Sequence, residues 1–551
     1  MSLHPQDSFL IPAETERVAR AAFPKGCLAL HVAEALGSLF QDQQFATLFP
    51  PRGQPAEAPA RLALATLLQF AEGLSDRQAA DAVRGRIDWK YALALELTHP
   101  GFDHTVLSEF RSRLVEGKAE LLLLNTLLTR CRELGLLKKR GRQRTDSTHV
   151  LAAVRVLNRL ERVGETLRAA LNALAVVAPD WLQGIASAEW YQRYGERVEN
   201  FDLPKTEKAR QDLAVTMAAD GQKLLAALDA DPEQSWLQEV PAVRILRRVW
   251  EEQYVEREGQ LCWRDSQNMP SPAELISSPY DTEARYSTKR SVEWVGYKVH
   301  ITETCDDERT PHLITNVETT PATTPDDNML EQVHESLQKR DLLPVEHLVD
   351  KGYTDAKTLV DSKQKYSVEI VGPVADDPSW QARAAEGFDK SQFQVDWERK
   401  VVTCPAGKQS VSWLPSTYPQ NGMKWEARFS RQDCGPCPFR AQCTRAKVEP
   451  RLIGLQEREH YEALQARRQH QKTEEFQKQY AARAGVEGTH AQAIQRCGLR
   501  QCRYMGMAKA HLQHVLTAAA INLVRITEWW TGTVRAATRR SRFAALRPVL
   551  A

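Results

Sequence analysis

The spacing of apolar residues predicts helices over residues 27–137. Apolar side chains recur there at three- and four-residue intervals, most clearly over Ala60–Phe70. Ser75, followed three residues later by Gln78, has the sequence of a capping box, which predicts that the next helix runs over Asp76–Arg84. The N-terminal part of the chain is therefore predicted to be helical.

A third helix is predicted to begin at Asp103 and to display Arg111 and Arg113. Short helices joined by tight turns, with basic residues on one of them, are typical of a helix-turn-helix. The same pattern is equally typical of a helical packing or dimerisation domain, and the sequence does not separate the two. We expect residues 1–137 to form a helical domain for DNA binding or dimerisation.

Strands are predicted in the middle of the chain, where polar and apolar residues alternate or short apolar runs occur. Helical spacing returns over residues 151–255, 328–338 and 473–530. The predicted strands are 142–150, which carries Asp146, then 292–304, 312–319, 347–350, which ends at Asp350, and 366–374. This order indicates an α/β protein whose sheet is interrupted by a long helical segment.

A polar face is predicted on the helix that follows Thr473. Its members recur at steps of four and three residues and therefore share one side: Phe476, Tyr480, Arg483, Glu487, His490 and Ile494. Tyr, Arg, Glu and His on one face indicate a site turned toward a charged ligand rather than a hydrophobic core.

Three carboxylates, Asp146, Asp350 and Glu487, come from separate predicted elements. Magnesium ions prefer oxygen ligands, usually a few carboxylates with water and substrate phosphate. A pair of such ions can activate an attacking oxygen and stabilise the leaving oxygen at phosphorus. Arg483, one turn before Glu487, could hold a phosphate. Taken singly, an aspartate such as Asp146 or Asp350 is more often a cap or turn residue.

The chain resembles the DDE transposases of bacterial insertion sequences, in the branch with an InsH-like helical N-terminal domain, from about Gly26 to Trp530. The family's Tyr, two residues, Arg, three residues, Glu motif is met by Tyr480, Arg483 and Glu487. Further matching segments are TDST (145–148), RYSTKR (285–290), WVGYKVH (294–300), HLVDKGYTD (347–355) and HLQHVLTAAAINLVR (511–525).

The resemblance implies an RNase H-like catalytic core in which Asp146, Asp350 and Glu487 hold two Mg²⁺ ions, for which Mn²⁺ can substitute. It implies cleavage at transposon ends, attack of the freed 3′-OH on target DNA, and a homodimer bridging both ends. One position departs from the family: its Lys seven residues after the Glu is replaced by Ile494, and Arg496 is the nearest cation that could take its role.

We expect an α/β fold with an RNase H-like mixed sheet, flanking helices and two insertions. The predicted parts are a helical N-terminal domain (1–137), a catalytic core (138–150, 286–375 and 473–530), a helical insertion (151–285), a Cys- and Trp-rich β insertion (376–472) and a basic tail (531–551). The residues expected to contact terminal inverted repeats or target DNA are Tyr480, Arg483, His490, Arg496, Lys298, Lys138, Lys139, Arg140, Arg111 and Arg113.

Four of the ten cysteines fall in the second insertion: Cys404, Cys434, Cys437 and Cys443. Cys404 opens CPAG and Cys434 opens CGPC, and four thiolates suit a closed tetrahedral Zn²⁺ site. The long first spacing leaves reduced buried cysteines or a redox-active CxxC as alternatives. A zinc ion here would be structural.

The positive charges of the chain are unevenly distributed, and this bears on DNA binding. The 551 residues include 73 Lys and Arg against 71 Asp and Glu, a net charge of +2, which is not typical of a DNA-binding protein. Residues 494–551, however, carry ten basic residues and one acid, and five cations fall within 138–144. Such local patches attract phosphate whatever the total charge.

The remaining composition is that of a globular protein, 42% hydrophobic and 26% charged. No uncharged apolar stretch reaches the length of a membrane span, and the first residues do not have the pattern of a signal peptide. We expect a bacterial cytoplasmic protein, associated with the nucleoid when bound to DNA. Two alternatives to a transposase are a domesticated, non-catalytic DNA-binding protein and a DDE-type nuclease without strand transfer.

Overall fold

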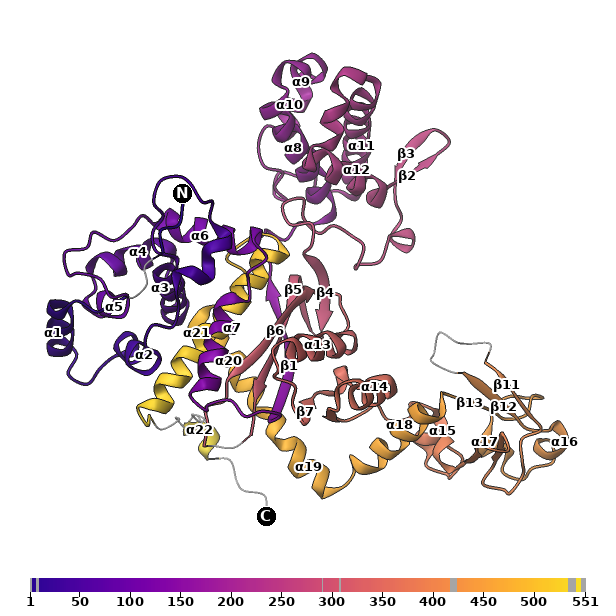
Figure 1. Ribbon diagram of the computed structural model, residues 1–551. Coiled ribbons are helices and arrows are strands. Elements are labelled where there is room, and N and C mark those ends of the chain that lie inside the picture. The colour runs from indigo at the N-terminus through magenta and orange to yellow at the C-terminus, as the bar shows by residue number, and fades with distance from the viewer. Residues whose placement is uncertain are drawn as a thin grey trace.

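A computed structural model describes residues 2–5, 9–289, 291–306, 309–416, 424–533 and 542–546 (Figure 1). A mixed sheet lies at the centre of the molecule, with the N-terminal helices on one side, a helical insertion at one end and a smaller β region beyond it on the other side. Most of the predicted basic tail, 531–551, lies outside the described residues. The part of the tail that is described includes the short helix α22 (Arg542–Ala545).

The central sheet is built around β1, which pairs antiparallel with β5 and parallel with β7. The strand order is β4-β5-β1-β7-β8, and β6 also pairs antiparallel with β5. The six strands are β1 (Arg142–Leu151), β4 (Arg285–Lys289), β5 (Val292–Thr304), β6 (Ile314–Pro321), β7 (Glu346–Val349) and β8 (Glu369–Val371). The mixed α/β architecture that the pattern predicts is therefore confirmed.

The predicted strand over 366–374 is wrong in its first part. Tyr366 is the last residue of α14 (Ala356–Tyr366), and Ser367 caps that helix in the left-handed conformation. Only Glu369–Val371 forms β8. Three strand residues next to a helix end are too few for an alternation to be recognised in the sequence.

Among the residues described before β1, there are seven α-helices and one 3-10 helix. They are α1 (Ala13–Ala22), α2 (Leu28–Leu36), η1 (Asp42–Leu48), α3 (Pro59–Glu72), α4 (Asp76–Gly85), α5 (Ile87–Ala92), α6 (His104–Glu116) and α7 (Leu122–Glu133). The predicted capping box is present, because the Ser75 hydroxyl accepts from the Gln78 amide and the Gln78 side chain accepts from Ser75 N. Asp103 likewise caps α6, as predicted.

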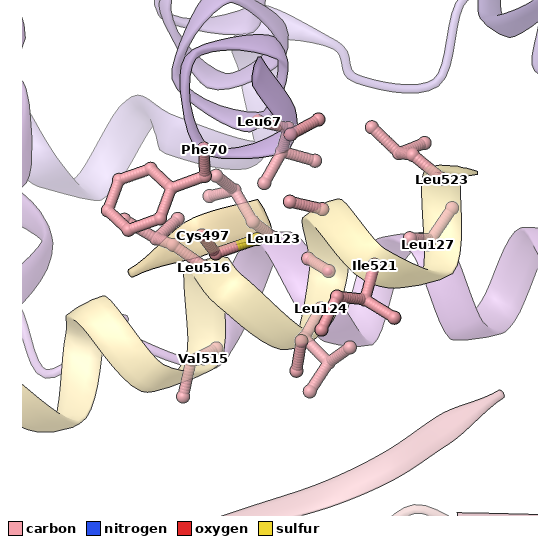
Figure 2. Packing of buried hydrophobic residues seen from close by; sticks show 14 of the residues in the cluster. Leu67, Phe70, Leu123, Leu124, Leu127, Cys497, Val515, Leu516, Ile521 and Leu523 are labelled. Carbon is pink, nitrogen blue, oxygen red and sulfur yellow. The ribbon is translucent and has the colours of Figure 1, made fainter. Parts of the chain in front are cut away.

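The N-terminal helices and the sheet share one hydrophobic cluster, which is centred on α21 (Met507–Trp530). Figure 2 shows Leu67 and Phe70 of α3 and Leu124 of α7 packed around Leu516 and Ile521 of α21. These side chains are fully buried. No helix in the described part of the chain is both long enough and apolar enough to span a membrane.

The helical insertion has its own hydrophobic cluster, formed by residues between Leu160 and Ile276. Its elements are α8 (Arg159–Val177), α9 (Pro179–Ile185), α10 (Ala188–Tyr194), α11 (Glu207–Ala230), η2 (Pro232–Glu239), α12 (Pro241–Gln253), β2 (Tyr254–Arg257), β3 (Gln260–Trp263) and η3 (Ser266–Asn268). The hairpin β2–β3 projects from the helices (Figure 1) and is too short to show in the sequence pattern.

The Cys-rich region contains two small antiparallel sheets, β9 with β10 and β11-β12-β13. Its elements are α15 (Trp380–Ala384), η6 (Lys390–Gln392), β9 (Gln394–Asp396), β10 (Val401–Thr403), β11 (Ser412–Pro415), β12 (Trp425–Arg428), α16 (Arg431–Cys434), α17 (Arg440–Cys443), β13 (Leu452–Leu455) and α18 (Arg458–His470). A separate cluster around Phe393, Phe429 and Ile453 forms its core.

Candidate active site

The sheet register brings Asp146 and Asp350 together. Thr145 of β1 is paired with Val349 of the parallel strand β7, so the next residue of each strand, Asp146 and Asp350, lies at the same level. The Asp146 carboxylate accepts a hydrogen bond from Ser147 N at 2.8 Å, and its side chain is 11% exposed. Asp350 caps η5 (Lys351–Tyr353) through a 2.8 Å bond from Gly352 N.

The polar helix face is divided among three elements rather than lying on one continuous helix. They are α19 (Glu474–Tyr480), the 3-10 turn η8 (Ala481–Ala484) and α20 (Gly485–Cys497). Arg483 lies on the turn and Glu487 on the first turn of α20, so the predicted four-residue spacing still brings the two together.

Arg483 bridges the three carboxylates. Its Nη2 atom lies 2.6 Å from Asp146 Oδ2 and 3.9 Å from Asp350 Oδ2, while Nη1 donates to Glu487 Oε1 at 3.1 Å. The Arg483 side chain is 15% exposed, whereas Glu487 is 68% exposed. The structure therefore gathers all three predicted carboxylates around one guanidinium group.

The charge balance of this cluster is unusual. Burial raises the pKa of Asp146, Arg483 opposes that rise and the Asp350 charge adds to it, with a resulting pKa of about 6. One guanidinium faces three carboxylates, so a net negative charge remains when all three are ionised. Oxygen donors with excess negative charge suit hard divalent cations such as Mg²⁺ and Mn²⁺.

A fourth carboxylate, Asp326, borders the site and was not predicted from the sequence. It begins η4 (Asp326–Met329) and accepts from Ser147 Oγ at 3.1 Å and from Lys298 Nζ at 2.9 Å. Burial raises the pKa of Tyr353, and the nearby charges of Asp326 and Asp146 add to that rise. Lys298, predicted to contact DNA, is thus held within the protein. The sequence identified Lys298 as part of the segment WVGYKVH, but it gave no sign that Asp326, 28 residues later, is its ion-pair partner.

The other predicted DNA contacts near the triad also have internal partners. Tyr480 stacks on Phe476 at 5.5 Å between ring centroids. His490 is buried beside Asp146, and burial lowers its pKa to about 4, so it is a neutral imidazole at neutral pH. Arg496 is exposed but donates through Nε to Ala71 O at 2.7 Å. As placed, none of the three is an unengaged surface group.

The basic residues between 138 and 144 do not form one exposed patch. Lys138 and Lys139 are exposed, but Arg140 donates to the carbonyls of Tyr366 and Ser367 at the end of α14. Arg142 pairs with Glu346 and Arg144 with Glu303, as the salt-bridge distances of 2.7 and 2.6 Å show. The last two arginines of this run therefore hold the sheet together. Contact of Lys138, Lys139 and Arg140 with DNA stays a prediction.

Arg111 and Arg113 of α6 are also engaged inside the N-terminal region. Arg111 Nη2 lies 2.5 Å from Asp76 Oδ2, and the side chain is 6% exposed. Its guanidinium lies over the Tyr504 ring. Arg113 donates to Leu48 O at 3.3 Å. In this conformation Arg111 stabilises the packing of α4 against α6 rather than offering a charge to DNA.

The four predicted cysteine ligands line one small pocket in the Cys-rich region. Cys404 precedes a tight turn in which Lys408 N donates to Cys404 Sγ at 3.4 Å. Burial raises the pKa of the Cys443 thiol, Arg451 opposes that rise, and Cys434, Cys404 and Cys437 add to it through their proximity. The four sulfur groups therefore lie in one neighbourhood.

As the side chains stand, no three Cys, His, Asp or Glu residues within the described ranges are arranged to hold a metal ion. At the three carboxylates, the Arg483 guanidinium lies within 3.9 Å of one oxygen of each.

Two family models match segments of the chain. One, described as a transposase DDE domain, covers residues 403–527, and the other, described as a transposase domain (DUF772), covers residues 17–113. Together they support a DDE transposase of insertion-sequence type. No curated protein and no solved structure matches.

The two transposase matches fall on different parts of the candidate site. The DDE match contains Arg483 and Glu487 together with the four cysteines, while Asp146 and Asp350 lie before it. The second match covers the helices from α1 to most of α6. The pairing of β1 with β7 brings the two unmatched aspartates together, and Arg483, in the matched segment, contacts both of them.

Proposed function

We propose that this protein is a DNA transposase that binds the terminal inverted repeats of an insertion sequence and catalyses strand cleavage and strand transfer. The observation that carries the proposal is the convergence of Asp146, Asp350 and Glu487 on Arg483 within 3.9 Å. Glu487 is largely exposed and is therefore not needed for packing there. The three carboxylates are suited to a phosphoryl-transfer centre.

Two Mg²⁺ or Mn²⁺ ions would be held by Asp146, Asp350 and Glu487. Such ions supply Lewis-acid stabilisation of the attacking and leaving oxygens in an in-line displacement. The protein's own groups orient this set: Ser147 N and Gly352 N each fix one aspartate by a 2.8 Å hydrogen bond. Ser147 Oγ donates to Asp326 at 3.1 Å, and Lys298 Nζ donates to the same carboxylate at 2.9 Å.

An RNase H-like core is supported by the strand pairing. Strands β6, β5 and β1 form an antiparallel set, and β1, β7 and β8 form a parallel one, with the candidate aspartates at the C-terminal end of β7 and in the middle of β1. A phosphodiester would bind beside Arg483. Guanidinium groups bind phosphate in a two-pronged geometry.

Recognition of the transposon ends is assigned to the N-terminal helices α1–α7, and the active complex is proposed to be a homodimer bridging both ends. The assignment of α1–α7 is supported by the match of residues 17–113 to a transposase domain. Action on chromosomal DNA in the bacterial cytoplasm, at the nucleoid, follows from this function.

The experiment incubates the full chain with Mg²⁺ and labelled duplexes taken from either side of its own coding sequence. A transposase produces nicks at a defined end and strand-transfer products joined to target DNA. Nicks without joined products indicate a nuclease, and a gel shift without either product indicates a non-catalytic DNA-binding protein. We expect Asp350→Ala to lose both products. The control, Glu475→Gln at an exposed position, is expected to keep them.

We also propose that Cys404, Cys434, Cys437 and Cys443 hold a structural Zn²⁺ ion. The proposal is supported by their common pocket and by the amide of Lys408, which faces the Cys404 sulfur. Four thiolates are a typical structural zinc set. Such a site would fix the short helices α16 and α17 against the turn that follows β10.

A further inference from the structure

We propose that Arg483 couples DNA binding to metal binding: without DNA it bridges the three carboxylates, and with DNA it moves to a phosphate and opens the site to divalent cations. This inference rests on the proposed function of the triad as a metal site. It adds a regulatory role for one residue, which the proposed function does not require.

The contacts of Arg483 are those of a resident counter-ion. Both terminal nitrogens are used, one on Asp146 Oδ2 at 2.6 Å and near Asp350 Oδ2, the other on Glu487 Oε1 at 3.1 Å. A Mg²⁺ ion binds carboxylate oxygens at about 2.0–2.1 Å. It would compete for the same oxygens and would lie against a like charge. The guanidinium and the ion therefore exclude each other at these atoms.

The bridging position of Arg483 is only partly fixed. Its Nε is buried with no hydrogen-bond partner among the described residues, and one of its partners, Glu487, has a side chain that is 68% exposed. Arg483 is carried by a short 3-10 turn between two α-helices rather than by the interior of a helix. Rotation of its long side chain is sufficient to exchange a carboxylate for a phosphate.

A phosphate is the ligand for which a guanidinium would leave carboxylates. A carboxylate is planar and a phosphate is tetrahedral, but each can accept two parallel N–H hydrogen bonds from a guanidinium group. When DNA arrives, its phosphate can take over Arg483, and the three carboxylates are left with their full negative charge. If metal ions bind only after the DNA is in place, other phosphodiesters are protected from cleavage. By linkage, the metal must raise DNA affinity by the same factor by which DNA raises metal affinity.

The experiment measures Mn²⁺ binding to the full chain by the electron paramagnetic resonance signal of the free ion. Titrations are made with and without an unlabelled duplex from the flank of the coding sequence, for wild type and Arg483→Gln. Arg458→Gln, which removes an exposed charge from α18, is the matched control. Asp350→Asn shows whether the ion that is measured binds at the triad.

For wild type we expect DNA to tighten Mn²⁺ binding by about 5- to 150-fold, the usual range of allosteric coupling. Arg483→Gln is expected to bind Mn²⁺ at least fivefold more tightly than wild type without DNA, and to respond to DNA at least fivefold less. Equal Mn²⁺ affinity of the two proteins without DNA, or an unchanged DNA effect in the variant, would overturn the coupling while leaving the triad intact. Absence of Asp350-dependent binding under every condition would refute the metal site itself, and the coupling with it.

Discussion

Arg525 of α21 and Glu303 of β5 form a buried ion pair, with Nη1 and Oε2 separated by 2.6 Å. Arg144 of β1 pairs with the other carboxylate oxygen at 2.6 Å, and Thr489 of α20 donates to Oε2 at 2.6 Å. Glu303 is fully buried. One carboxylate therefore ties the long C-terminal helix, the central strand and the helix of Glu487 together.

Replacing this carboxylate is expected to be costly. Glu303→Gln keeps the shape but leaves Arg525 and Arg144 without their counter-ion, and breaking a buried pair in this way typically costs about 3–5 kcal/mol. Urea unfolding followed by circular dichroism measures the change. A loss below about 1 kcal/mol would show that the two arginines find other partners. The control, Glu475→Gln on the exposed side of α19, is expected to have almost no effect.

The same pair predicts a specific pH dependence. Burial tends to raise the pKa of Glu303, but Arg525 and Arg144 outweigh burial and lower it to about 2. A glutamate in the unfolded chain titrates near pH 4.3, roughly. The stability that Glu303 contributes is thus complete above that pH and is lost as the pH falls toward 2. The difference in unfolding free energy between wild type and Glu303→Gln should be constant from pH 7 to 5 and shrink below pH 4. A difference that grows in acid would contradict the assignment.

Two glycines of α20 make a matched pair for testing the packing beneath Glu487. A Cβ atom at Gly485 would lie 2.1 Å from Arg144 Nη1, whereas one at Gly488 would meet nothing within 4 Å. Gly485→Ala is expected to destabilise the protein by about 1–3 kcal/mol because the pinned Arg144 must shift. Gly488→Ala should stabilise it by about 0.4–1 kcal/mol, as a helix-interior Gly→Ala change does. Equal effects in urea unfolding would mean that Arg144 moves freely.

Metal removal tests the proposed zinc site. The purified protein should contain about one zinc per chain by mass spectrometry of the element, and Cys437→Ser should lose it. A chelator should lower the thermal stability of wild type but not of that variant. Cys262→Ser, in the hairpin β2–β3, should retain the zinc. Zinc-free protein with unchanged stability would leave the four cysteines as ordinary reduced thiols.

Much of the fold was predictable from local patterns. The strand 292–304 matches β5 at both ends, and the capping box at Ser75 begins α4. Both depend on residues a few positions apart, which is where periodicity and capping act. The short strands β2, β3 and β8 were missed or misplaced, because three or four residues carry too little pattern.

The residue types of the site could be predicted from the sequence, but the ion-pair partners of its basic residues could not. The basic run 138–144 looked like a surface patch because its partners are remote: Glu303 for Arg144 and Glu346 for Arg142. The basic residues after Ile494 likewise face inward in part, as Arg503 donates to Leu74 O at 3.0 Å. Such pairings depend on tertiary contacts, and a count of charges along the chain does not contain them.

The role of Asp326 was hidden for a similar reason. Its sequence context, a turn with two neighbouring aspartates, predicts only a helix start. It borders the triad because η4 packs beside η5, and Asp326 there accepts from Ser147 and Lys298. Sequence spacing cannot report that approach.

In the proposed mechanism Asp350 binds a divalent metal ion directly during DNA cleavage. The most direct measurement is cleavage of the labelled flanking duplex by Asp350→Cys in Mg²⁺ and in Mn²⁺, because a thiolate is a poor ligand for Mg²⁺ and a better one for the softer Mn²⁺. We predict no cleavage in Mg²⁺ and recovery of at least tenfold in Mn²⁺, relative to Asp350→Ala under the same conditions. Cleavage by Asp350→Cys in Mg²⁺ at the wild-type rate, or equal inactivity of both variants in Mn²⁺ while wild type cleaves, would contradict a direct metal contact at Asp350.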